Sequence, residues 1–154
     1  MNRHKPHVFV LPEDDANRQL ANGFVNYNCV DQNRIQVLRP AGGWTKVRDK
    51  FASDHVASME KFTQGFMILL LDFDGDEARR QEIIIPPSLA DRVFIIGVLS
   101  EPEDLKAARR YEDIGHELAE NCTTDQYAAW DHPLLKHNAA ELSRLRRLVR
   151  PILI

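Results

Sequence analysis

Six consecutive apolar residues at positions 66–71 form the strongest structural signal in this chain, and an acidic segment, Asp-Phe-Asp-Gly-Asp, follows them directly. A short run that is apolar at every position predicts a strand buried on both faces. Such strands are typical of parallel sheets, which helices cover on both sides. The abrupt change at Asp72 indicates that the strand ends there and that the chain enters a polar loop.

Three further segments have the same short, apolar character, at residues 7–11, 35–38 and 92–98. A segment with helical features follows each strand, including residues 44–62 with their 3.6-residue apolar stripe and residues 76–82. Ser100 has the spacing of a helix cap, and a last helix is expected at about residues 132–149. Alternating strands and helices predict an α/β fold: a mainly parallel, Rossmann-like sheet of four strands, helices on both faces, and additional C-terminal helices.

A length of 154 residues predicts a single domain, with a core at about residues 7–105 and a helical extension at about 106–154. The two cysteines, Cys29 and Cys122, lack the spacing of a zinc site, and we expect reduced thiols in a cytoplasmic protein. The apolar run after the basic N-terminus is shorter than that of a signal peptide. No run reaches the roughly 18 residues of a membrane span, so we expect no membrane association.

Acidic residues follow three of the four expected strands. Ligands of open parallel sheets bind outside the carboxyl ends of the strands, so these acids should gather at one edge. A divalent cation would relieve their repulsion, and Mg²⁺ favours one or two carboxylates with water. Asp76 and Glu103 also suit helix N-termini. The expected metal ligands are Glu13, Asp72, Asp74, Asp76, Glu101 and Glu103.

A first strand that ends in Glu and a later strand that ends in Asp-x-Asp resemble the TOPRIM domain. This family includes topoisomerases, DnaG-type primases and the nucleases of the OLD (overcoming lysogenization defect) group. The resemblance covers the expected core. It implies that Glu13, Asp72 and Asp74 are catalytic and hold Mg²⁺, or Mn²⁺ in its place, for phosphodiester chemistry. It also implies that Glu101 or Glu103 serves a second metal ion.

The start of the chain is also similar to response-regulator receiver domains. That resemblance would give Asp14 and Asp15 the role of the metal-binding pair, Asp72 that of the phosphate acceptor and Ser100 that of the hydroxyl residue. Receivers require a fifth strand, however, and residues 105–131 offer only helix and loop. The string Asp-Phe-Asp-Gly further resembles haloacid dehalogenase-type phosphatases, whose nucleophile instead follows the first strand.

Basic residues lie just after the Asp-rich loop and in the last helix. They predict a nucleic-acid-binding rim despite a net charge of −3, while the alternative is an amphipathic helix packed on the domain. The predicted contacts to DNA or RNA are Arg79, Arg80, Arg144 and Arg147.

Together these features predict a Mg²⁺-dependent, TOPRIM-like nucleic-acid phosphodiester-processing protein or nuclease-like subunit. The chain has no Walker motif, so any ATP hydrolysis would come from a separate ATPase partner. The apolar C-terminus either packs into the core or forms an interface, for example in a homodimer. Asp14 stands where TOPRIM sequences usually have glycine. The sequence therefore leaves open whether the chain is an enzyme, a non-catalytic α/β interaction module or an atypical receiver-like signalling domain.

Overall fold

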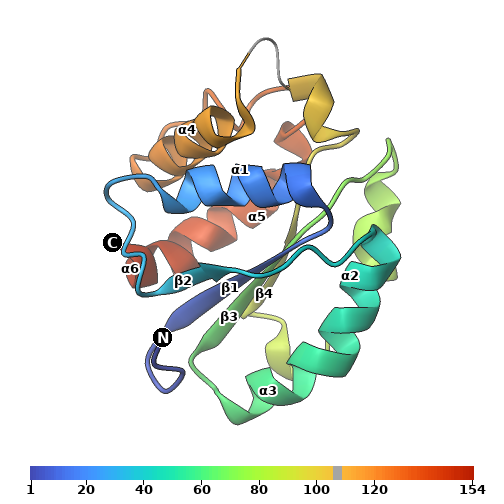
Figure 1. Ribbon diagram of the computed structural model, residues 1–154, viewed down its shortest axis with the longest axis vertical. Coiled ribbons are helices and arrows are strands. Elements are labelled where there is room, and N and C mark those ends of the chain that lie inside the picture. Colours follow the sequence, from blue (N-terminus) through green and yellow to red (C-terminus); the bar gives the residue numbers. More distant parts are fainter. Residues whose placement is uncertain (106–108) are drawn as a thin grey trace.

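The computed structural model describes residues 1–105 and 109–154. Its centre is a four-stranded, all-parallel sheet with the strand order β2-β1-β3-β4 (Figure 1). The strands are β1 (His7–Pro12), β2 (Ile35–Val37), β3 (Gly65–Leu70) and β4 (Val93–Ile96). The predicted α/β fold with a parallel sheet is confirmed. The expected boundary between core and extension falls at residues 106–108, outside the described residues.

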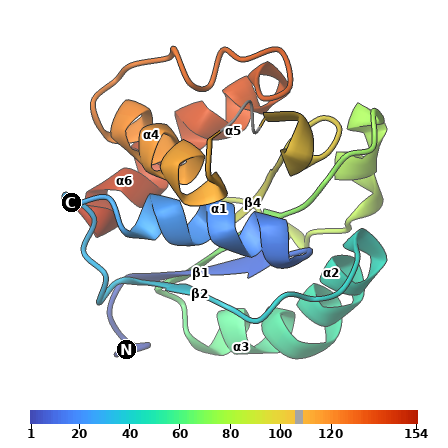
Figure 2. The ribbon, with the colours of Figure 1, turned by 45° about the horizontal axis from the view of Figure 1, so that its top comes forward.

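Helices cover both faces of the sheet (Figures 1 and 2). One face carries α1 (Asp15–Val25), α4 (Tyr111–Thr123), α5 (Ala139–Arg144) and α6 (Arg150–Leu153); the other carries α2 (Trp44–Lys50) and α3 (Val56–Lys61). Single π-helical turns, Phe51–His55 and Leu145–Val149, join α2 to α3 and α5 to α6.

Three expected helices differ from the structure. The segment after β3 is a 3₁₀ helix, Glu77–Glu82, and the one after Ser100 is a 3₁₀ helix, Pro102–Leu105. The C-terminal helix begins only at Ala139, after a 3₁₀ turn. Short 3₁₀ segments are common as connectors, and an apolar stripe alone does not distinguish them from one or two turns of α-helix.

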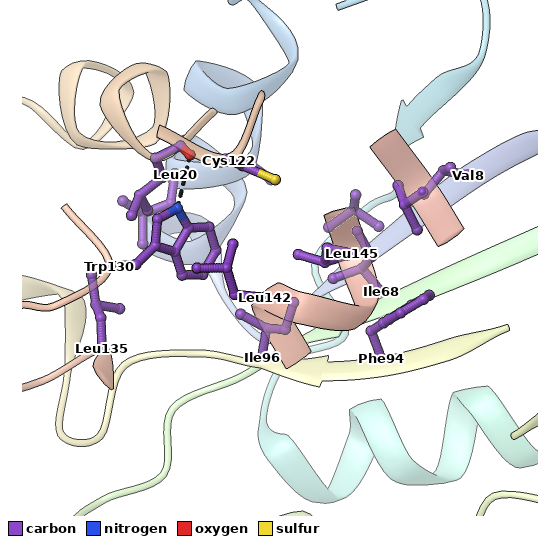
Figure 3. Packing of buried hydrophobic residues seen from close by; sticks show 14 of the residues in the cluster. Val8, Leu20, Ile68, Phe94, Ile96, Cys122, Trp130, Leu135, Leu142 and Leu145 are labelled. Carbon is purple, nitrogen blue, oxygen red and sulfur yellow. Dashed lines mark hydrogen bonds between the residues drawn. The ribbon is translucent and has the colours of Figure 1, made fainter. Parts of the chain in front are cut away.

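Successive side chains of a strand point to opposite faces of the sheet, so the hydrophobic core has two layers, one on each face. Val8 and Val10 face the layer beneath α1, α4 and α5, whereas Leu11 faces the layer beneath α2 and α3. Trp130 lies in the first layer, where its indole Nε1 donates a hydrogen bond to the Leu118 carbonyl at 2.9 Å (Figure 3). Burial on both faces explains why the strands are apolar at every position.

The outer edge of β4 is closed by side chains in place of another strand. Ile95 N–H donates to Glu141 Oε2 at 2.7 Å, and Gly97 N–H donates to Asn138 Oδ1 at 3.2 Å. The Asn138 amide donates back to Gly97 O, and Arg80 Nε donates to Ile95 O. These contacts satisfy an edge that would otherwise be free to pair with another strand.

Candidate functional site

The carboxyl ends of β1 and β3 meet at the edge where the sequence predicted a site. Glu13 lies directly after β1, and its Oε2 accepts a hydrogen bond from the Asp72 backbone N–H at 2.6 Å. The Glu13 N–H in turn donates to Leu70 O at 2.8 Å. The structure therefore brings Glu13 and Asp72 together, although they are 59 positions apart in the chain.

Asn17 is the residue of this site that sequence reasoning missed. It is fully buried, and its amide Nδ2 donates to Asp14 Oδ1 and to Asp72 Oδ1, both at 3.0 Å. Asp14 also caps α1 by accepting from the Asn17 backbone N–H. The sequence does contain one indication that Asn17 is buried. Asn17 lies on the apolar stripe of α1, three and four positions before the buried Leu20 and Ala21. A polar residue on such a stripe requires a polar partner.

Asp74 is exposed and forms an ion pair with Arg79. The Arg79 guanidinium donates to Asp74 Oδ2 at 2.8 Å and to Asp72 O at 2.9 Å, and it lies 4.6 Å from the centre of the Trp44 ring. Asp74 and Gly75 have positive φ angles of 49° and 79°. The turn that follows β3 is thus fixed by Arg79.

Burial and negative charge act together on the buried carboxyl groups. Burial raises the pKa of Asp72 to about 7; the hydrogen bond from Asn17 opposes this rise, whereas the charges of Glu13, Asp14 and Asp74 add to it. The pKa of Glu13 is also raised by burial, against the hydrogen bond from Asp72. The site therefore holds protons that exposed carboxyl groups would release well below neutral pH.

Three buried polar atoms without a hydrogen-bond partner accompany these acids. Within the described residues, the buried side-chain atoms that lack a partner are Asn17 Oδ1, Arg79 Nε and Ser100 Oγ. Asn17 and Arg79 contact Asp72 directly, and Ser100 follows β4, which pairs with β3. Unsatisfied buried atoms are uncommon in folded proteins, and two of these three belong to residues that contact Asp72.

The other predicted acidic residues lie farther from this centre. Asp76 caps the 3₁₀ helix Glu77–Glu82 by accepting from the Ala78 N–H at 3.0 Å. Glu103 lies beside Tyr111; burial, then Glu103, and then the charges of Asp14 and Asp72 raise the pKa of that phenol. Glu101 and Glu103 are both exposed, and Glu103 contacts Tyr111 at the start of α4.

Most of the predicted basic rim makes contacts within the protein. Arg80 and Arg144 donate to the backbone of β4, at Ile95 O and Val93 O, and Arg79 fixes the turn after β3. Arg147 is exposed. The sequence predicts that Arg80 and Arg144 form a free basic surface. In the structure their guanidinium groups instead donate hydrogen bonds to backbone carbonyls at the outer edge of β4.

The donor types at this edge suit a hard divalent cation. Glu13, Asp72 and Asp74 supply carboxylate oxygens, and the unpartnered Asn17 Oδ1 is an amide oxygen; these are the ligands that Mg²⁺ and related ions prefer. As the described side chains stand, no group of three or more Asp, Glu, His or Cys residues converges on one point. Asp74 would have to turn from Arg79 to join the other two.

Comparison with protein-family models, with curated proteins and with solved structures found no match for this chain. Among the described residues, no helix combines the length and the apolar character required to cross a membrane. The geometry of the carboxyl edge therefore carries the functional argument.

Proposed function

We propose that this protein binds a divalent cation, Mg²⁺ or Mn²⁺, at the carboxyl edge of its sheet and uses it to process nucleic-acid phosphodiesters. Glu13 and Asp72 would hold the ion, and Asp74 would join them. The observation that carries this proposal is Asp72: its backbone N–H donates to Glu13, its buried carboxyl group accepts from Asn17, and the Oδ1 atom of Asn17 has no partner among the described residues. A cation would compensate the negative charge that burial leaves unsolvated.

A bound cation would supply Lewis-acid polarisation of a phosphoryl oxygen. The residues of the chain have separate tasks in this proposal. Asn17 orients Asp72, and Arg79 fixes the turn that carries Asp72 and Asp74. Burial raises the pKa of Glu13, which would hold the cation beside Asp72.

Plasmid nicking in the presence of Mg²⁺ or Mn²⁺ tests this proposal. We expect Glu13→Gln and Asp72→Asn each to lower the rate at least about 100-fold, because each removes a carboxylate of the proposed centre. Asp91→Asn is the matched control, since Asp91 is exposed at the opposite end of the sheet beside β4. Equal rates in all three variants would contradict the site assignment.

We further propose that the protein acts in the cytoplasm together with a separate ATPase subunit. The described cysteines are free, with Cys29 exposed and Cys122 buried, as in a reducing compartment. Co-purification with an ATPase would support the subunit interpretation. Nicking by the isolated chain at the full rate would contradict it.

A receiver-like phosphoacceptor is the second candidate function. The order β2-β1-β3-β4 equals the first four strands of the flavodoxin-like order, and Asp14 and Asp72 share the Asn17 amide. Against this function, side chains close the edge of β4 where receivers have a fifth strand. Labelling of Asp72 by acetyl phosphate would favour a receiver, and absence of both labelling and cation binding would favour a non-catalytic interaction module.

A further inference from the structure

The beginning of α2 forms a basic and aromatic surface directly beside the acidic edge. The N–H groups of Gly42 and Gly43 donate to Glu13 O at 2.8 and 3.2 Å, so the start of α2 is attached to the loop that carries Glu13. In both ribbon views, α2 lies next to the 3₁₀ helix Glu77–Glu82, which carries Arg79 (Figures 1 and 2).

Trp44 is the centre of this surface. It is half-buried, and two guanidinium groups lie over its ring, Arg79 at 4.6 Å and Arg48 at 5.4 Å from the ring centre. The Arg79 side chain is 14% exposed and is held by Asp74, whereas the Arg48 side chain is 41% exposed and pairs with Asp49, a solvent-exposed neighbour, at 3.0 Å. Arg48 therefore presents a planar, charged group to solvent beside an aromatic ring.

Lys46 adds a second accessible charge. It is exposed, and its side chain folds back over Gly42, where a Cβ would lie 3.8 Å from Lys46 Nζ. The ammonium group thus lies near Gly42, whose N–H donates to Glu13 O, and hence near the Glu13 loop. Neither cation has a structural task comparable with those of Arg80 and Arg144 at the edge of β4.

We propose that Trp44, Lys46 and Arg48 bind single-stranded nucleic acid and direct its backbone toward the carboxyl edge. Aromatic rings and arginine planes stack on unpaired bases, while nearby cations contact phosphates, and this combination is typical of single-strand binding surfaces. A duplex does not expose the faces of its bases. This inference deepens the proposed function by naming the form of its substrate and the surface that receives it.

Fluorescence anisotropy of a labelled oligothymidylate tests the inference with the full chain in EDTA. EDTA separates it from the proposed function, because strand binding at this surface does not need a cation. We expect Trp44→Leu to weaken binding about tenfold or more through loss of stacking. Lys46→Ala combined with Arg48→Ala should reduce the slope of log affinity against log salt by about 1.4, or about 0.7 per lost contact.

Lys61→Ala is the matched control, because Lys61 is exposed at the end of α3, just before β3 and away from the carboxyl edge of the sheet, and should leave binding unchanged. Quenching of Trp44 emission on binding gives an independent readout; Trp130 is buried and should not respond. The inference is overturned if Trp44→Leu binds as tightly as the parent chain, if the salt slope of the double variant is unchanged, or if a hairpin duplex binds as well as the single strand.

Discussion

Asp72 carries a buried carboxyl group whose ionisation is opposed both by burial and by the neighbouring acidic residues. Asp72 is only 7% exposed, its carboxyl group accepts a hydrogen bond from Asn17, and the charges of Glu13, Asp14 and Asp74 act on it. Charge burial of this kind costs stability unless a partner compensates it. Both residue-scale predictions follow from that cost.

The contribution of Asp72 to the stability of the protein should fall as pH rises from about 4 to about 7. Because the folded pKa of Asp72 is about 7, above the unfolded value of about 3.9, the folded state binds more protons in this window. Asp72→Asn removes this penalty, so the variant should exceed the parent chain by on the order of 2 kcal/mol at about pH 8 and match it near pH 4. Urea unfolding at both pH values is the measurement. A variant less stable than the parent at the higher pH would refute the account of Asp72.

Asn17→Ala should lower the free energy of unfolding by about 1–3 kcal/mol, because it removes the hydrogen bonds to Asp14 and Asp72 and leaves both carboxyl groups without that donor. Asn22→Ala, in the same helix but only half-buried, should change it little. Denaturant titration of the two variants gives the comparison. If Asn17→Ala and Asn22→Ala have equal free energies of unfolding, the hydrogen bonds of the Asn17 amide do not stabilise the fold.

At the scale of elements, β4 depends on side chains for its outer hydrogen bonds. Asn138 alone bonds to both the N–H and the carbonyl of Gly97 and also accepts from Arg80. Glu141 accepts from Ile95 N–H one turn later. A helix packed with these polar groups toward a strand edge blocks further strand addition there.

Asn138→Ala should therefore destabilise the fold by about 1–3 kcal/mol, since it leaves the buried N–H of Gly97 without its partner, while His137 Nε2 still contacts Gly97 O. Ser143→Ala, an exposed change in the neighbouring α5, is the control and should be nearly neutral. Thermal unfolding monitored by circular dichroism compares them. If Asn138→Ala unfolds at the parent temperature, the edge of β4 does not rely on this contact.

At the scale of the whole molecule, the sequence could predict the parallel sheet and the meeting of Glu13 with Asp72. Uniformly apolar strands and acids at their ends are local patterns, and parallel topology brings those ends together. The partners of Arg80 and Arg144 could not be predicted in the same way, because they depend on which distant segment lies against β4. The contact of Asp74 with Arg79 could not be predicted either, because it depends on the positive φ angles of Asp74 and Gly75 in the turn after β3.

The most direct test of the account is calorimetric titration of the protein with Mg²⁺ at about pH 7. The account predicts binding at or below millimolar concentration, accompanied by proton release from the carboxyl groups, so that the observed enthalpy depends on the buffer. Asp72→Asn should abolish this signal, and Asp91→Asn should retain it. No binding by the parent chain, or equal binding by Asp72→Asn, would contradict a cation site at the carboxyl edge of the sheet.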